Sequence, residues 1–225
     1  MKKINNKAFG FINIAIYIFL TDILTLLLIS FRSSSNSLFL NILYLIPPVI
    51  VALILIYINK DLFKDKFIDF KKNFPKYFNL AFKYYICGLI AMIMASNLIN
   101  LFTSPISENE TLNRQILTTL PLYAVISMVI IAPISEEITF RGSFKKGYHN
   151  KAIYLILTSF LFGIMHVIFN GDFLNFLPYS ALAIFLGKIY YESDNILLSI
   201  STHAFHNALC IILLYLGSVL WRKYL

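Results

Sequence analysis

The stretch from Leu117 to Gly142 reads LTTLPLYAVISMVIIAPISEEITFRG, an apolar run that ends in a short charged segment. The run is longer than the roughly 20 mostly apolar residues that an α-helix needs to cross a bilayer. Glu136 and Glu137 lie inside it, and Arg141 follows one helical turn later. Ionisable side chains inside a membrane span are costly and are functional candidates by default. The stretch therefore predicts a membrane helix that carries a buried charged cluster.

The rest of the chain has the same apolar character. Of its 225 residues, 59% are hydrophobic and 13% are charged, and the mean hydropathy is +0.75. Soluble domains are about 45–50% apolar and about 25% charged. Helices satisfy their own backbone hydrogen bonds in lipid, so we expect an all-α, polytopic membrane helix bundle. We expect one membrane domain over residues 1–225, with a motif-bearing core at residues 117–220.

Hydropathy predicts about seven spanning helices. Their approximate bounds are Phe11–Phe31, Leu38–Ile58, Leu80–Phe102, Leu117–Phe140, Ala152–Phe169, Phe173–Tyr190 and Ile196–Trp221. The last run is long enough to tilt or to break, so eight segments remain an alternative.

The formal net charge of +8 comes from lysines grouped between the apolar runs. Cytoplasmic loops of membrane proteins are enriched in lysine and arginine, so we expect a cell-membrane protein with a cytoplasmic N-terminus, in contact with anionic lipid. No basic face for nucleic acid can be built from such loops. The connection at residues 103–114 is acidic. The lysine-rich stretch Lys60–Tyr77 predicts an amphipathic helix on the inner leaflet. Seven spans would place Arg222 and Lys223 outside, which a re-entrant segment would correct.

The spacing of the charged cluster suggests two different roles. Glu137 and Arg141 are four residues apart, so they share a helix face and can pair. Glu136 points about 100° away and has no partner in sequence. A carboxylate in a low-dielectric site can activate water as a general base. We therefore assign Glu136 to chemistry, and Glu137 and Arg141 to structural support of the site.

Two further motifs lie on later apolar runs. Phe162 and His166 are one helical turn apart, and so are His203 and Asn207. The N–H groups of His203 and Asn207 could donate to an oxyanion when a carbonyl is attacked. We interpret His206 as a polar contact between helices. One carboxylate, two imidazoles and a carboxamide suit the hydrolysis of an amide, with Glu136 and His166 activating water.

The three motifs are Glu136-Glu137-x-x-Phe140-Arg141-Gly142, Phe162-x-x-x-His166 and His203-x-x-x-Asn207. In order and spacing they resemble the signature of the CPBP family. That family groups type II CAAX prenyl endopeptidases with bacteriocin-processing and bacteriocin-immunity membrane proteins. The resemblance covers about residues 117–220.

The resemblance implies an intramembrane protease with a cavity open to the cytoplasm. It gives Glu136 and His166 the water-activating role, His203 and Asn207 the oxyanion role, and Phe162 a supporting role. Members are often described as metalloproteases, and a metal-free, glutamate-activated water is also argued. Glu136, His166 and His203 could form a facial site for a divalent metal such as zinc. We favour metal-free chemistry, because no His-Glu-x-x-His motif is present.

One geometric condition tests whether these residues form a single site. If its helix begins near Ala152, His166 lies about 20 Å from the cytoplasmic end, at 1.5 Å per residue. Glu136 and His203 would be shallower than that. Tilt or a later helix start must therefore bring the three together.

Two other functions compete with proteolysis. A non-catalytic bacteriocin self-immunity protein would keep the fold without needing every catalytic residue, yet all are present here. A transporter would use the carboxylates as an ion relay, but we find none of the duplicated halves that it predicts. The expected partner is a peptide or membrane-protein substrate, in contact with lipid. The composition, rich in Lys, Asn and Ile, suggests an AT-rich bacterial genome, so we expect a peptide precursor in preference to a prenylated substrate.

Overall fold

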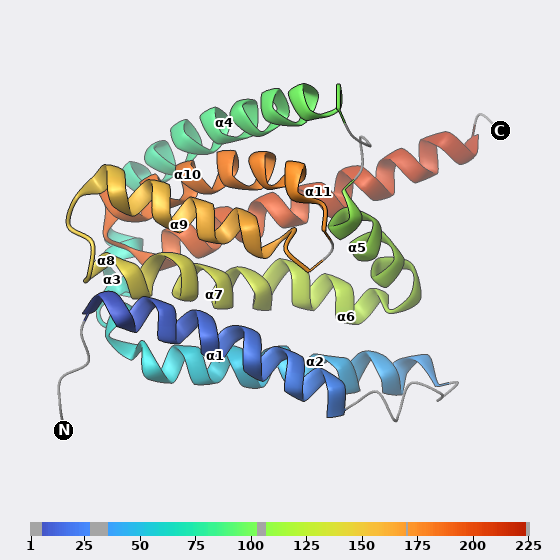
Figure 1. Cartoon of the computed structure of the whole chain (residues 1–225), viewed down its shortest axis with the longest axis horizontal. Helices are drawn as coiled ribbons and strands as arrows, with labels where there is room; N and C mark the ends of the chain where they lie inside the picture. Colours follow the sequence, from blue (N-terminus) through green and yellow to red (C-terminus); the bar gives the residue numbers. More distant parts are fainter. Residues whose placement is uncertain (1–5, 28–35, 103–106, 170, 224–225) are drawn as a thin grey trace.

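The computed structural model describes residues 6–27, 36–102, 107–169 and 171–223, and its long elements are all helices (Figure 1). These are α1 (Asn6–Leu27), α2 (Ser37–Ile58), α4 (Phe74–Ile99), a continuous helix from Pro121 to Lys145 that includes α6, α7 and α8, α9 (Lys151–Met165), α10 (Phe176–Ser193) and α11 (Ile196–Lys223). Each coincides with one of the seven predicted apolar runs. The predicted all-α, polytopic fold class is therefore confirmed, although residues 28–31 of the first run lie outside the described residues.

Not every one of these helices is long enough to cross a bilayer. Within the described part of the chain, five are long and apolar enough: α2, α4, the helix from Pro121 to Lys145, α10 and α11. α9 has 15 residues, or about 22 Å at 1.5 Å per residue, which is less than the ~30 Å of a hydrocarbon core. The chain is a multi-pass membrane protein, and these five full-length spans lie within its described residues.

One helix was not predicted. α5 (Glu108–Thr119) occupies part of the segment that the sequence analysis took as an acidic connection; residues 103–106 of that segment lie outside the described residues. Ser107 caps the helix, because its side chain accepts a hydrogen bond from the Glu110 backbone N–H at 3.1 Å. Glu108 and Glu110 lie in the first turn, where carboxylates interact favourably with the helix dipole. The helix is too polar for a hydropathy search to detect.

The predicted amphipathic helix over Lys60–Tyr77 is wrong as a single element. The segment contains a 3-10 turn (Lys60–Leu62), then α3 (Lys66–Lys72), and α4 already begins at Phe74. Asp65, in the left-handed conformation with φ 59°, separates the first two. α3 is fixed to the bundle by Asp69, whose carboxylate accepts hydrogen bonds from Tyr77 (2.6 Å) and Asn195 (2.8 Å).

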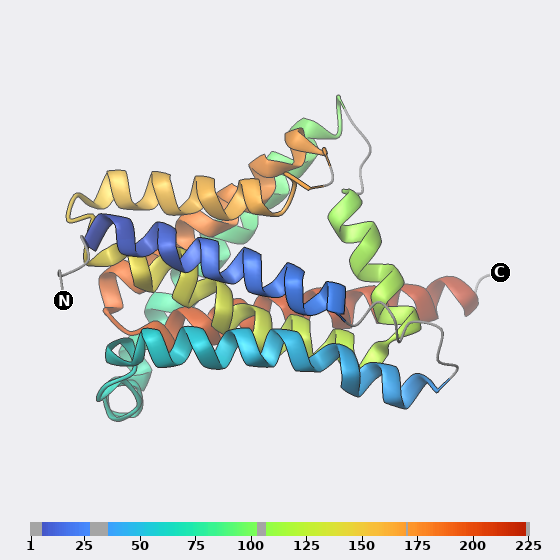
Figure 2. The same ribbon diagram turned by 60° about the horizontal axis from the view of Figure 1, so that its bottom comes forward.

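The bundle has two chemically different ends (Figure 1). At one end lie the beginning of α1, the end of α2, α3, α8 and the beginning of α9, together with most of the described lysines. Ion pairs hold this end, including Lys145–Asp194 at 2.7 Å and Lys151–Glu192 at 2.7 Å. α5 lies at the opposite end, across the ends of the long helices (Figure 2). We refer to these as the lysine-rich end and the α5 end.

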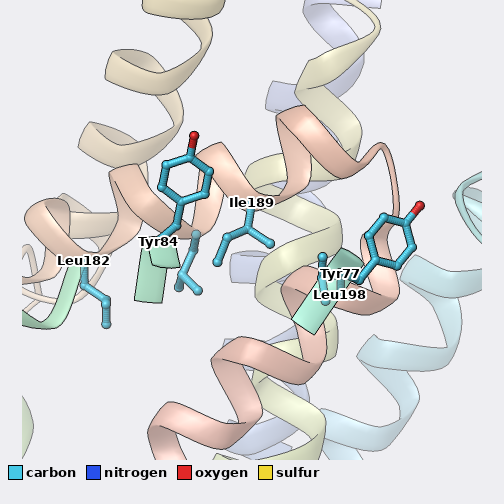
Figure 3. Close-up of a cluster of buried hydrophobic side chains, with 6 residues drawn as sticks. Tyr77, Tyr84, Leu182, Ile189 and Leu198 are labelled. Atoms are coloured by element: carbon cyan, nitrogen blue, oxygen red, sulfur yellow. The ribbon is translucent and has the colours of Figure 1, made fainter. Parts of the chain in front are cut away.

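Packing of α4, α10 and α11 forms a hydrophobic core beside the motif-bearing helix. Figure 3 shows this cluster, which has members from all three helices. The buried side chains are Tyr77, Tyr84, Leu182, Leu186, Ile189 and Leu198. The cluster fixes the position of α11, which carries His203 and Asn207. Many other large apolar side chains are exposed, as expected where lipid surrounds the helices.

Candidate active site

Two π-helical turns flank the two glutamates, at Ser127–Ile131 and Ile138–Gly142, and the second contains Arg141. Between them, α7 (Ala132–Glu137) carries both glutamates. π-turns inside α-helices are rare and are frequently found at functional sites. Pro133 explains the first of them in part, because it has no N–H to donate to the preceding turn. The sequence predicts a regular helix here and carries no signal for either turn.

Asn207 supplies a hydrogen bond to the helix backbone at the point where Pro133 cannot donate one. The N–H of Ala132 bonds to Ser127 O, five residues back. A bond with the same five-residue spacing would join Met128 O to the N–H of residue 133. That residue is Pro133, which has no N–H. The Asn207 side-chain amide donates to Met128 O instead, at 2.7 Å. One amide hydrogen of Asn207 is therefore committed to the helix, and the second is left for the cavity that Asn207 lines.

Glu137 is the centre of a buried network that joins two helices. Its side chain and that of Arg141 are fully buried, and Arg141 Nη1 lies 3.1 Å from Glu137 Oε1, as the spacing predicted. The guanidinium makes this ion pair without a well-directed hydrogen bond. Across the helix interface, His203 Nδ1 is 2.9 Å from Glu137 Oε1, and Ser199 Oγ donates to Oε2 at 2.5 Å. Ser199 had no signal in the sequence, because nothing there placed α11 against Glu137.

Phe162 connects the charged network to the second motif. The Arg141 guanidinium lies over its ring, 4.2 Å from the centroid, in cation–π geometry. The same ring packs edge-on to Phe140 at 5.7 Å and to His203 at 5.7 Å. The ring also contacts the imidazole of His166, with centroids 4.4 Å apart. Phe162 therefore contacts both the Arg141 guanidinium and the His166 imidazole.

The two imidazoles present equivalent atoms to the cavity. His166 Nδ1 is 2.8 Å from Phe162 O, an acceptor, so Nδ1 carries the proton and Nε2 is left as the base. In His203, Nδ1 faces Glu137 and Nε2 lies 3.8 Å from Glu136 Oε2. Glu136 itself is 12% exposed. Its carboxylate and the free edge of His203 thus face each other across a narrow gap.

Two adjoining cavities, of about 220 and 270 Å³, share Glu136 and His166 in their linings. The larger cavity also reaches His203 and Asn207, so all four residues assigned to chemistry border one space. Glu136, His166 and His203 therefore reach the same cavity, with His166 at the C-cap of α9, although α9 does not begin later than expected. From Glu136 the larger cavity extends to α5, where its lining includes Asn109, Glu110, Asn113, Arg114 and Leu117.

His206 agrees with its interpretation as an interhelical contact. Its Nδ1 is 3.3 Å from the Tyr85 hydroxyl of α4, and its ring packs edge-on to the Tyr85 ring. It also lines the larger cavity. Because Nδ1 is engaged with Tyr85, the position of the His206 ring is set by α4.

The metal site considered for Glu136, His166 and His203 is not formed by the described residues. Nowhere in the described part of the chain do three or more His, Cys, Asp or Glu side chains group closely enough to hold a metal ion. Glu137, which would otherwise add a donor, is engaged by Arg141, His203 and Ser199.

Comparison with known proteins gives these motifs a family. A family model described as type II CAAX prenyl endopeptidase Rce1-like matches residues 118–209, which include all three motifs. The UPF0177 protein YbdI of Lactococcus lactis is 31% identical over 129 residues, covering 57% of this chain and 69% of that protein. YxdF of the same organism is 27% identical over 144 residues, covering 61% and 80%.

An uncharacterized protein of Mycoplasma capricolum is 32% identical over 91 residues, or 40% of this chain, and the match spans 27% of that relative's length. No solved structure matches the chain. The shared region is the motif-bearing half in the Rce1-like match, and the UPF0177 match extends over more than two thirds of the relative. The chain belongs to the CPBP family, together with the Rce1-like endopeptidases and the UPF0177 proteins.

Proposed function

We propose that this protein is an intramembrane endopeptidase that cleaves a peptide or membrane-anchored precursor with a water activated by Glu136. The observation that carries the proposal is the convergence of Glu136, His166 and His203 on one cavity, with each imidazole held by its Nδ1 and presenting Nε2. General bases and oxyanion donors must be fixed in this way before substrate arrives.

The proposed reaction begins with a water in the cavity beside Glu136. The Glu136 carboxylate removes a proton from this water as its oxygen attacks the scissile carbonyl, and His166 Nε2 accepts a second hydrogen bond that orients it. The carboxyl group then returns the proton to the leaving amine. The peptide C–N bond breaks, and the new carboxylic acid, which keeps the second proton of the water, and the amine leave the cavity.

His203 and the second amide hydrogen of Asn207 are proposed to stabilise the tetrahedral oxyanion. His203 can donate from Nε2 only as an imidazolium, because Nδ1 already faces Glu137. Glu136, Glu137 and Arg141 together carry one net negative charge, and a proton on His203 makes the cluster neutral.

The proposal includes the location of the protein. We propose a bacterial cell-membrane protein with its N-terminus in the cytoplasm, because lysines gather at the end of the bundle where α1 begins. The proposed substrate is the precursor of a small secreted peptide, such as a bacteriocin or a signalling peptide.

The test compares secreted and membrane peptides from cells that express the wild type, Glu136→Gln or Glu108→Gln. Glu108 is a matched control, since it is an exposed glutamate of α5 that does not line the cavity. A peptide whose terminus changes with the wild type and Glu108→Gln, but not with Glu136→Gln, identifies both activity and substrate. If Glu136→Gln processes peptides normally, or protects cells from a bacteriocin as well as the wild type does, the catalytic assignment is wrong and the immunity function is favoured.

A further inference from the structure

Tyr179, on the first turn of α10, contacts the proposed site without belonging to any motif. Its ring stacks on the imidazole of His166, with centroids 4.6 Å apart and planes 26° apart. Because Phe162 lies against the imidazole at 4.4 Å, His166 has an aromatic neighbour on each of two sides. The Nδ1 bond to Phe162 O fixes rotation within the ring plane, and the two aromatic rings restrict tilting out of it.

The hydroxyl of Tyr179 makes a different connection. It accepts a hydrogen bond from Asn109 Nδ2 at 3.1 Å and exchanges another with Ser107 Oγ at 3.1 Å. Ser107 is the N-cap of α5, and Asn109 lies in its first turn. A second bond holds the same turn, from the Glu108 backbone N–H to Asp172 at 3.1 Å. Tyr179 is therefore the side chain through which the α5 wall of the cavity reaches His166.

We infer that Tyr179 is a positioning residue for the proposed reaction: its ring fixes the plane of the His166 imidazole, and its hydroxyl attaches α5 to that imidazole. The inference rests on the proposed function. It predicts that the two parts of the side chain affect different steps. The ring governs turnover through His166, and the hydroxyl governs substrate binding through α5, since α5 lines the cavity.

The experiment separates the two parts with Tyr179→Leu, which removes the ring, and Tyr179→Phe, which removes only the hydroxyl. Tyr191→Phe is the control, because Tyr191 lies on the same helix and its hydroxyl donates to His149 O at the lysine-rich end. Ring protons of ¹³C-labelled histidine are recorded in detergent micelles, with His166→Gln used to assign the His166 signals. Stacking shifts these signals upfield in the wild type, Tyr179→Phe and Tyr191→Phe, and they move downfield in Tyr179→Leu.

Kinetics use as probe the peptide identified through Glu136. Tyr179→Leu lowers kcat about 10-fold, whereas Tyr179→Phe leaves kcat unchanged and raises KM. Unmoved His166 signals in Tyr179→Leu, or equal loss of kcat in both variants, overturn the role of the ring. An unchanged KM in Tyr179→Phe overturns the role of the hydroxyl. The histidine spectrum is recorded without substrate. If the wild type is inactive but shows the expected His166 shifts, the proposed function is refuted and the stacking of Tyr179 on His166 is not.

Discussion

Removing Arg141 tests the central claim that Glu137 and Arg141 form the buried support of the site. Both side chains are fully buried, and Arg141 Nη1 lies 3.1 Å from Glu137 Oε1. Arg141→Met keeps an unbranched side chain over the Phe162 ring and removes the charge. Glu137 then retains only the bonds from His203 and Ser199. Breaking a buried ion pair by deleting one partner costs about 3–5 kcal/mol, because the remaining charge is left in a low-dielectric environment.

A second variant shows how much of the lost free energy of unfolding comes from each unpaired charge. Glu137→Gln leaves the Arg141 charge buried and should cost a similar free energy. In the double variant neither charge is left unpaired, so its cost should be lower than the sum of the two single costs by about 0.5–3 kcal/mol. The assay is equilibrium unfolding in mixed micelles, followed by circular dichroism. Arg114→Met is the matched control. Arg114 forms an exposed ion pair with Glu110 and should contribute less than about 1 kcal/mol.

Three results would refute this reasoning. One is an Arg141→Met protein as stable as the wild type, which would mean that the charge of Arg141 is not needed to hold Glu137. Another is strict additivity in the double variant, which would show that the two charges do not interact despite their 3.1 Å separation. A loss of stability equal to that of Arg114→Met would likewise place Arg141 with ordinary surface pairs.

Three further outcomes are expected. Asn207→Ala leaves Met128 O without its 2.7 Å hydrogen bond and should lower the free energy of unfolding by about 1–3 kcal/mol; a neutral effect in the same micelle assay would contradict this. Gly163→Ala places a Cβ about 2.9 Å from Phe176 O, so α9 and α10 must separate at a cost of about 1–3 kcal/mol, visible as a lower thermal midpoint. The pKa of Asp69 is held below its ordinary value of 3.8 by the hydrogen bond from Tyr77 and then by that from Asn195. The ionised Asp69 carboxylate therefore contributes its full stabilisation above this ordinary pKa and loses it as the pH falls below that value. The decrease in thermal midpoint between pH 5 and pH 3 should accordingly be smaller in Asp69→Asn than in the wild type.

The sequence was sufficient for the fold class and for the pairing of nearby residues on one helix. Apolar runs of about 20 residues predict membrane helices whatever their neighbours are, because lipid requires internal backbone hydrogen bonds. Each of the seven predicted runs coincides with a helix over most of its described residues. Glu137 pairs with Arg141 because a four-residue spacing fixes their relative direction. α5 was missed since its stability comes from capping and polar contacts, which hydropathy does not measure. The single amphipathic helix over Lys60–Tyr77 was wrong because Asp65 adopts a left-handed conformation.

The site needed contacts between residues far apart in the chain, and these exist only in the tertiary structure. Sequence spacing separated Glu136 from Glu137 by direction, but it could not show that Glu137 holds His203 and Ser199 on α11. It also gave Asn207 a chemical role without revealing the carbonyl of Met128, which Pro133 leaves without a partner. The Leu117–Gly142 stretch thus determined that charges would be buried in a membrane helix, since its composition alone sets that cost. Which groups compensate each charge was decided by helix packing, because a buried donor or acceptor is satisfied by whatever side chain the fold brings within hydrogen-bond distance.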